Sequence, residues 1–403
     1  MVSIQKSTLN SLLFTFAYII YLAYNLLSVS FYYKYIASLH NLVIISCISL
    51  LLLKELRYHK FNYKDLLILL FSSICFVLFY KNLGINQAIL MLFVYSARNI
   101  NMIEFFKLSY KLSFVLLLFI IISGKIGIIE NYTGISGERQ REYLGFRYAL
   151  YPTSILGNIV FLKIYIERKN ITWLALIILF VSSVILYLFT DSRLTTGISI
   201  IIIVLAALFK KYNSIENIFK RGYLIISYIV SAVTSIYFTL KYDYLSEWQS
   251  NLNELLGGRL SLGNMTLDFY GIDWFGKKIN LIGMGLDADG EQNMSDTYDY
   301  VDNLYIQLLL RMGILFLIIF ILIMTMMVYK AYKNKDVYLV IILVLLAFHG
   351  IIDDLILSIQ FNSFFMVVST VLYTYNKTKN YERWRYVRLF NSRSWIVRCN
   401  LCS

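Results

Sequence analysis

The chain has 403 residues, of which 59% are hydrophobic and 15% are charged, and its formal net charge is +13 at pH 7. Soluble domains carry about 25% charged residues, so this composition excludes an ordinary soluble enzyme and indicates an integral membrane protein. No segment alternates apolar and polar residues over the length of an outer-membrane strand, so we expect helices and not a barrel.

Apolar runs long enough to cross a bilayer recur along the chain. A hydrocarbon core of about 30 Å needs roughly 20 mostly apolar residues in a helix, and the sequence predicts an all-α integral membrane protein with about 12 transmembrane helices. The first run lacks a small-residue cleavage site, so we expect it to be retained and not removed as a signal peptide. The runs lie near residues 11–30, 37–53, 65–80, 84–97, 112–129, 152–166, 171–190, 194–209, 222–240, 304–329, 337–350 and 354–375.

Basic residues indicate how the predicted helices are oriented. Lysine and arginine gather in alternate loops, such as 54–64, 98–111 and 210–221. Loops rich in Lys and Arg stay in the cytoplasm, so we expect both chain ends on the cytoplasmic side. The loop 241–303 falls on the other side and is acidic, with 11 Asp and Glu against 4 Lys and Arg. Its aromatic residues provide apolar area, so we expect one large extracytoplasmic loop packed on the bundle.

The chain is expected to form one polytopic membrane domain over residues 1–376, since it has no linker, low-complexity segment or internal repeat. Two long external loops, 130–151 and 241–303, interrupt the short spacing, and loops of that length are often functional. Residues 377–403 interleave basic and aromatic side chains. We interpret them as a basic aromatic cytoplasmic tail, either an ordinary positive-inside tail or a segment bound to anionic lipid.

Five arginines fall on the predicted external side, where the positive-inside rule disfavours them. Arginine is always charged and binds phosphate or carboxylate through a planar fork. A group of arginines therefore suits a polyanionic head group, and lipid pyrophosphate is the candidate at that depth. The alternative is a set of structural ion pairs with Glu138, Glu142 and Asp191. The five are Arg139, Arg141, Arg147, Arg193 and Arg259.

Asp302 and Asn303 lie at the predicted membrane boundary, directly before an apolar run that begins at Leu304. Asp and Asn are favoured helix N-caps, which is one interpretation of these residues. A carboxylate at this place is also a candidate general base, facing the anion that the arginines hold. Asp353 and Asp354 are expected on the same side, as loop residues or sugar contacts.

The sequence predicts no metal, cofactor or nucleotide site. Asp287, Asp289 and Glu291 resemble half of a calcium loop, but the ligand spacing of an EF-hand is missing. The 4 cysteines include a lone CxxC in the tail, without the second pair that a zinc site needs. There is also no glycine-rich loop that would cradle a nucleotide phosphate.

Four stretches beyond residue 130 form an ordered set of motifs. They read REYLGFRYALYPTSILGN (141–158), TDSRLTTG (190–197), GGRLSLGN (257–264), and INLIGMGLDADG (279–290) followed by DNLYIQLLLRMGILF (302–316). Together they resemble the Wzy-type repeat-unit polymerases of bacterial O-antigen and capsular polysaccharide, relatives of the O-antigen ligases. The first resembles the arginine-rich segment of that family, the second its Ser-Arg turn between helices, and the others its large external loop.

The resemblance implies a GT-C-like glycosyltransferase of the bacterial cytoplasmic membrane that works without a cofactor. Its substrates would be undecaprenyl-diphosphate-linked oligosaccharides. Its other partners would be membrane lipids and the flippase and chain-length regulator of the same pathway, with no nucleic acid. On this chain the implied catalytic residues are Asp302, Arg259 and Arg193. The implied substrate-binding residues are Arg139, Arg141, Arg147, Glu142, Asn303 and Tyr305.

The chain departs from the family pattern at two places. Many members have His directly before the Asn, where this chain has Asp302. A histidine base is therefore absent, which leaves either the carboxylate as the base or a role of this position in placing the substrate. Some members separate Arg and Gly by ten residues in two external loops. Here 9 residues separate Arg147 from Gly157 and 11 separate Arg259 from Gly271, so that spacing supports no argument.

Other functions remain open at this point. An O-antigen-ligase-like enzyme would move the glycan to another acceptor. A lipid-linked oligosaccharide flippase or other transporter would show polar or interrupted helices that meet at mid-membrane. Here the centres of the predicted helices are nearly uncharged and the polar groups concentrate outside, which favours an enzyme. A structural or sensor membrane protein is the remaining alternative.

Overall fold

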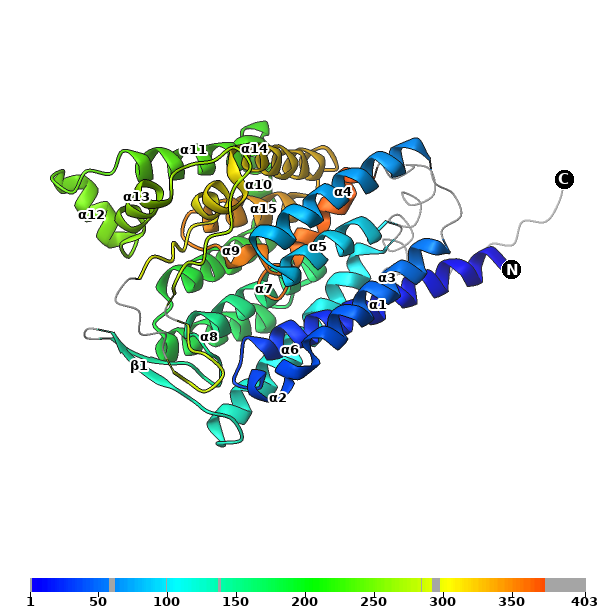
Figure 1. Ribbon diagram of the computed structural model, residues 1–403, viewed down its shortest axis with the longest axis horizontal. Helices are drawn as coiled ribbons and strands as arrows, with labels where there is room; N and C mark the ends of the chain where they lie inside the picture. Colours follow the sequence, from blue (N-terminus) through cyan, green and yellow to red (C-terminus); the bar gives the residue numbers. More distant parts are fainter. Residues whose placement is uncertain are drawn as a thin grey trace.

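The computed structural model describes residues 2–57, 62–98, 100–136, 139–283, 285–291 and 298–373, so the predicted tail 377–403 lies outside the described residues. Most of these residues form helices that lie side by side in one bundle (Figure 1). The α-helices are α1 (Val2–Ser28), α2 (Tyr33–Ile36), α3 (His40–Leu56), α4 (Tyr63–Asn82), α5 (Ile85–Ser96), α6 (Met102–Lys125), α7 (Leu150–Glu167), α8 (Trp173–Thr190), α9 (Arg193–Lys211), α10 (Asn213–Ile218), α11 (Ser227–Leu240), α12 (Glu247–Leu255), α13 (Arg259–Tyr270), α14 (Leu304–Lys333), α15 (Val337–His349) and α16 (Val368–Leu372). Short 3-10 helices are η1 (Ala37–Leu39), η2 (Arg168–Asn170), η3 (Gly222–Ile226), η4 (Leu355–Leu357) and η5 (Ser363–Val367).

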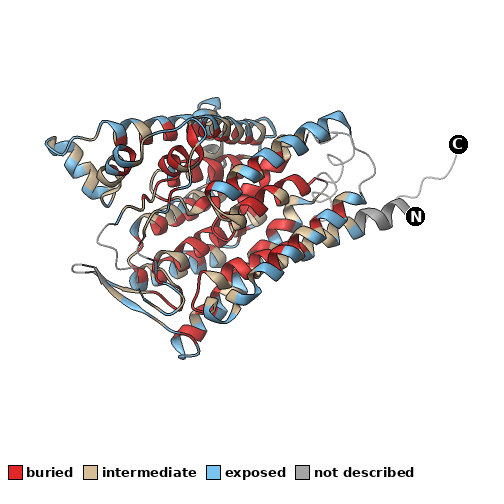
Figure 2. Ribbon diagram, viewed as in Figure 1, coloured by how far each residue is buried: buried red, intermediate tan, exposed pale blue. Residues whose placement is uncertain are grey.

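Within the described ranges, 8 helical segments are long and apolar enough to cross a membrane. These segments indicate a multi-pass membrane protein. Each coincides with a run that the sequence predicts as a span. Buried residues lie on the faces that the helices turn toward one another, and exposed residues on the outer faces (Figure 2). The segments are Leu9–Ser28, Tyr33–Leu56, Tyr63–Asn82, Met102–Lys125, Trp173–Thr190, Arg193–Lys211, Gly222–Leu240 and Leu304–Lys333.

The other four predicted runs differ from full-length spanning helices. α5 has 12 residues and α15 has 13, which is short of the roughly 20 that cross a bilayer. α7 is mostly buried and packs against α6, α8, α9 and α15 in the interior. The run 354–375 was predicted as one helix, and that prediction is wrong. The described part of this run contains η4, η5 and α16, joined by irregular backbone.

The segment between α15 and α16 lies buried inside the protein although it is irregular. Backbone groups in an apolar interior need partners within the chain, so such a segment depends on side chains. Asn158 of α7 accepts from the Ser363 amide at 3.1 Å and donates to the Ser363 hydroxyl at 3.0 Å. Asn362 accepts from the Phe364 amide at 3.1 Å and donates to the Ile356 carbonyl at 3.0 Å. These two asparagines supply bonds that a regular helix would otherwise make.

One end of the bundle carries the non-spanning structures, and we call it the loop end (left in Figure 1). Strands β1 (Thr133–Ser136) and β2 (Arg139–Glu142) form an antiparallel hairpin there, which the all-α prediction did not include. Helices α12 and α13 lie within the predicted large loop 241–303. Because α13 packs against α11 and α14, this loop rests on the bundle.

A glycine interrupts α14 and opens it to the large loop. Gly313 has φ +85° and ψ 172°, a conformation that only glycine adopts readily. The two amides that follow it are bonded outside their helix. Ile314 donates to the Asp273 carbonyl at 3.0 Å and Leu315 donates to the Trp274 carbonyl at 3.2 Å. The large loop therefore completes the hydrogen bonding of α14 at this break.

We expect Gly276→Ala to destabilise the protein strongly. Gly276 has φ +71°, which costs another residue about 1–3 kcal/mol. An added β-carbon would also overlap the Arg311 carbonyl oxygen and the Met312 backbone. Thermal unfolding of the purified protein in detergent should show a lower midpoint than the wild type. The control is Gly197→Ala in α9, where the methyl group meets no atom within 4 Å and the midpoint should stay or rise. An unchanged midpoint for Gly276→Ala would contradict this close contact.

Candidate functional site

An ion pair at the loop end joins the start of α13 to the segment before α14. Arg259 Nε donates to the main-chain carbonyl of Asp302 at 3.1 Å, and Arg259 Nη2 lies 3.3 Å from Asp302 Oδ2. The two side chains are 17% and 18% exposed, so water screens their attraction less than that of a surface pair. The fold thus brings together two of the residues predicted to be catalytic.

Local features fix the position of Arg259. Gly258 has φ +82°, which turns the chain into α13. The side-chain oxygen of Asn253 accepts from the amides of Leu260 and Ser261, at 3.0 Å each. These bonds cap the first turn of α13, where backbone amides otherwise lack partners. The start of the helix is therefore rigid, and Arg259 is held with it.

Strand β2 places Arg141 near this ion pair. Successive residues of a strand face opposite sides, so Arg141 and Glu142 point apart. Arg141 is close enough to lower the pKa of Asp302, whereas the Glu142 carboxylate lies 2.5 Å from Lys125 Nζ. The Nε atom of Arg141 is enclosed without a partner, and nothing among the described residues bonds to this guanidinium. Arg141 therefore has donors available for a ligand.

Two further carboxylates lie in the turn after α15. The first amide of α14 donates to the Gly350 carbonyl at 2.8 Å, which brings this turn to the start of α14. Asp353 and Asp354 follow in the turn. The Asp353 carboxylate raises the pKa of Asp302, and the Asp302 carboxylate raises the pKa of Asp354. Oδ2 of Asp354 accepts from the Tyr300 hydroxyl at 2.5 Å. The loop end thus gathers three carboxylates beside two arginines.

Burial decides which of these acids is ionised. Burial raises the pKa of Asp302 from 3.8 to about 6, against the lowering effects of Arg259 and Arg141, and Asp353 adds to the rise. Burial also raises the pKa of Asp354 to about 8, and the carboxylates of Asp302 and Asp353 raise it further. At neutral pH Asp302 is therefore the ionised acid next to the arginines, while Asp354 is mostly protonated.

The acids of the loop end do not form a metal-ligand set. His349 Nε2 lies 3.4 Å from Asp353 Oδ2. Across the described ranges, no group of three or more His, Cys, Asp or Glu side chains could hold a metal ion. The positive charge of the site comes from its arginines.

Arg147 contacts other parts of the loop end. Its amide donates to the Val29 carbonyl at 3.1 Å, as the chain after the hairpin pairs with the chain after α1. Its Nη2 donates to the Ser28 carbonyl at 2.7 Å, and its guanidinium lies 4.6 Å from the centre of the Tyr33 ring. Its Nη1 lies 3.5 Å from the Leu286 carbonyl. Arg147 therefore ties α1, α2 and the large loop together.

The two remaining arginines of the prediction are placed differently. Arg193 begins α9, and its Nε donates to Asp191 Oδ1 at 3.2 Å with 58% of the side chain exposed. This is the structural ion pair that the sequence left open as an alternative. The Arg139 backbone pairs with Ser136 in the hairpin. The Arg139 side chain and Glu138 lie outside the described part of the chain.

Asn303 caps α14, and this leaves the Asp302 carboxylate free of that role. The Asn303 side-chain oxygen accepts from the amides of Tyr305 and Ile306 at 3.0 and 3.2 Å, and its nitrogen donates to the Ser235 hydroxyl at 2.8 Å. Tyr305 is fully buried, and its hydroxyl donates to a carbonyl of α15 at 2.8 Å. Both side chains are thus bonded within the protein and position α14 against α11 and α15.

The sequence interpretation missed three side chains near these residues. Arg311 in α14 is partly buried and donates to the Asn82 carbonyl at 3.1 Å. A signal for Arg311 existed, because an ionisable residue inside an apolar run is a candidate for function. Lys125 and Tyr300 gave no such signal, since each meets a carboxylate that is distant in the sequence.

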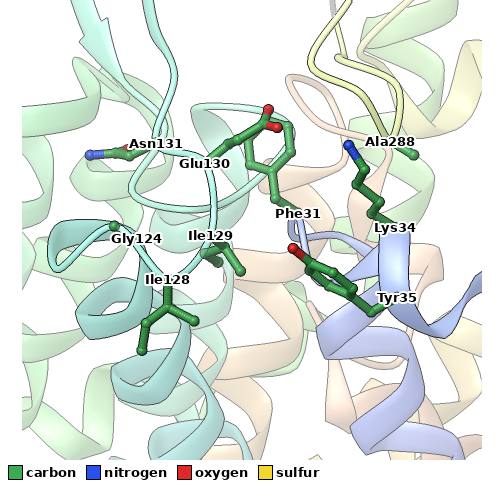
Figure 3. A pocket seen from close by; sticks show the side chains of 10 residues that line it. Phe31, Lys34, Tyr35, Gly124, Ile128, Ile129, Glu130, Asn131 and Ala288 are labelled. Carbon is green, nitrogen blue, oxygen red and sulfur yellow. The ribbon is translucent and has the colours of Figure 1, made fainter.

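A surface hollow of about 380 Å³ lies between α2 and the segment that leads from α6 to β1 (Figure 3). Lys34 and Glu130 stand on opposite sides of it, and Tyr35 at its edge is 65% exposed. Lys34 Nζ lies 3.0 Å from Asp289 Oδ1, so its charge is already paired. The wall of the hollow carries both a positive and a negative charge, so it favours a diphosphate less than the surroundings of the unbonded Arg141 guanidinium do.

No family model, curated protein or solved structure matches this chain.

We expect Arg147→Ala to lower the thermal unfolding midpoint, whereas Arg193→Ala should leave it unchanged. Removing Arg147 deletes charged hydrogen bonds worth about 1.5–3 kcal/mol each and the contact with the Tyr33 ring. The pair of Arg193 with Asp191 is exposed, and such pairs contribute little to stability. Thermal unfolding of both variants in detergent checks this. A larger decrease for Arg193→Ala than for Arg147→Ala would reverse the assignment.

Proposed function

We propose that this protein is a membrane glycosyltransferase that polymerises undecaprenyl-diphosphate-linked oligosaccharide repeat units into a capsular or O-antigen polysaccharide. The observation that carries the proposal is the unbonded guanidinium of Arg141 beside the Arg259–Asp302 pair. A lipid diphosphate offers acceptor oxygens to such donors, and its polyprenyl tail suits the apolar surface of the bundle. The ordered motifs of the sequence support the same class of enzyme.

In this proposal the loop end faces the outside of the bacterial cytoplasmic membrane, and both chain ends lie in the cytoplasm. The distribution of lysine and arginine supports that orientation. About 12 crossings would result if α5, α7, α15 and the segment around α16 complete the spans, in a GT-C-like arrangement. Membrane lipids would surround the bundle, and the flippase and chain-length regulator of the pathway would act beside it.

The proposed reaction joins two lipid-linked glycans. A hydroxyl oxygen of the acceptor glycan attacks the anomeric carbon of the donor, and the bond from that carbon to the diphosphate oxygen breaks. Arg259 and Arg141 stabilise the negative charge on the departing lipid diphosphate. Asp302 takes the proton of the attacking hydroxyl as the general base. The acceptor lipid then carries a longer glycan, and the donor lipid leaves as its diphosphate.

The proposal narrows the set of residues that the sequence suggested. Arg193 already pairs with Asp191, so we do not assign it to the diphosphate. Glu142 already pairs with Lys125, so we do not assign it to substrate binding. Asn303 and Tyr305 would act by holding α14, and with it the preceding Asp302, in place. Arg147 would act in the same indirect way through α1 and α2.

We expect Arg141→Gln to abolish long surface polysaccharide in cells that lack the natural gene. The Arg141 side chain has no hydrogen bond to the described residues, so this substitution removes charge without removing a side-chain hydrogen bond. The matched control is Lys241→Gln, which removes one positive charge from an exposed position of the large loop. Gel electrophoresis of the surface glycan measures chain length, and immunoblotting of membranes measures protein level. Polymer of normal length with Arg141→Gln would contradict the proposal.

The same deletion strain distinguishes the alternatives. If the protein is a flippase, lipid-linked repeats should accumulate inside the deletion strain. An O-antigen-ligase-like enzyme predicts that polymer of normal length forms on its lipid carrier but is not transferred to its final acceptor. A polymerase predicts single repeats on the cell surface.

The rate of glycan elongation in proteoliposomes should fall as the pH drops through about 6. Asp302 must be ionised to accept a proton, and burial raises its pKa to about 6. Protonation therefore removes the base at lower pH, and the rate should be about tenfold lower at pH 5 than at pH 7. Asp302→Asn should be slower by about 10²–10⁴-fold, with a flat profile over this range. A wild-type rate that is constant from pH 5 to pH 7 would exclude Asp302 as the base.

A further inference from the structure

A second cavity at the loop end differs in charge from the hollow in Figure 3. Its volume is about 380 Å³, and it lies between the ends of α1, α3 and α5. The hollow in Figure 3 includes a glutamate, whereas this cavity has an arginine and no Asp or Glu in its wall. The field inside it therefore favours an anion. Its wall includes Tyr24, Tyr33, His40, Asn41, Asn86 and Arg147.

The polar side chains of this cavity are arranged as donors. His40 Nε2 lies 3.0 Å from Asn86 Oδ1, so the ring nitrogen donates and the Asn86 amide nitrogen has no partner in the described part of the chain. The Tyr21 hydroxyl donates to the Asn86 carbonyl at 2.6 Å, which holds the start of α5 against α1. Asn41 is exposed beside His40. The NH₂ group of Asn86 thus remains for a ligand.

Arg147 adds a fixed positive charge to these donors. Its guanidinium is held over the Tyr33 ring and by the Ser28 carbonyl, with no carboxylate paired to it among the described residues. Tyr24 is 6% exposed, and its hydroxyl has no hydrogen-bond partner. The Tyr24 ring centre lies 5.8 Å from that of His40. A buried hydroxyl without a partner is unfavourable, so a ligand that bonds to Tyr24 would be stabilised.

One helix begins at the cavity and strengthens its preference for anions. α5 begins at Ile85, and the residue before it is Gly84, which has no side chain to cap the helix. Helix N-termini carry partial positive charge and unpaired amides, which favour phosphate groups. The cavity therefore combines an arginine, an amide donor and the start of a helix.

The outer surface beside the cavity is apolar. Leu42 and Ile45 follow Asn41 on α3 and are 62% and 63% exposed, and α3 belongs to a candidate span. A lipid tail against these side chains places its head group at the level of Asn41. We propose that the cavity binds the phosphate or diphosphate head group of a membrane lipid. This proposal does not rest on the glycosyl transfer proposed above.

Binding of farnesyl diphosphate to the full-length protein in detergent micelles tests the proposal. Both variants are made in an Arg141→Gln background, so that Arg141 does not contribute to binding. We expect Asn41→Asp to raise the Kd about tenfold or more, because it places a carboxylate beside the bound phosphates. Asn251→Asp makes the same change at an exposed position of α12 and should leave the Kd unchanged. Equal Kd values for Asn41→Asp and its parent would overturn the proposal.

Two further probes separate the head group from the tail. Farnesol lacks the phosphates, and binding as tight as that of farnesyl diphosphate would overturn the assignment of an anion site. Inorganic diphosphate lacks the tail, and equally effective displacement by it would overturn the assignment to a lipid. We expect both to bind at least about tenfold more weakly than farnesyl diphosphate.

The lipid site and the polymerase activity are tested by different experiments. If Asn41→Asp does not change lipid binding while Arg141→Gln abolishes long polysaccharide, the cavity proposal fails and the polymerase proposal stands. If Asn41→Asp weakens lipid binding while Arg141→Gln leaves polysaccharide length normal, the polymerase proposal fails and the lipid site stands.

Discussion

The demand of the backbone for hydrogen bonds in an apolar surrounding governs this structure. Hydrocarbon offers no partners, so a chain that leaves the regular helix there must be bonded within the protein. Asn158 and Asn362 meet this demand for the segment before α16. The carbonyls of Asp273 and Trp274 meet it for the amides that follow Gly313 in α14. Each of these irregular places thus depends on a partner from elsewhere in the chain.

The hydrogen-bond partners of the arginines at the loop end also distinguish their roles. Arg147 gives its two Nη donors to main-chain carbonyls and keeps only its Nε without a partner, and Arg193 gives its Nε to the neighbouring Asp191. Arg259 is shared, because it holds the loop to Asp302 and still carries its charge at the site. The guanidinium of Arg141 has no hydrogen-bond partner among the described residues, which makes it the arginine best suited to a ligand. Charge alone therefore does not identify a binding arginine, whereas unused donors do.

Local properties of the sequence predicted part of this architecture. Length and apolar composition gave 8 of the predicted spans, because both can be read within one helix. The prediction of one helix over 354–375 was wrong, because the conformation of this segment depends on Asn158 of another helix. Arg259 and Asp302 were expected at one site because both fall on the predicted external side and because the family resemblance groups them. The partner of Arg147 is 119 residues away, and no local pattern reveals a contact of that separation.

The break in α14 has a mechanical consequence. The carbonyls of Asp273 and Trp274 are hydrogen-bond partners of helix amides, so this part of the loop cannot lift away as a free lid without breaking both hydrogen bonds. A movement of the loop must instead carry the adjoining half of α14 with it. The two halves meet at Gly313, where the backbone already bends. Motion at the loop end would therefore tilt the half of α14 that follows Gly313 and ends at Lys333.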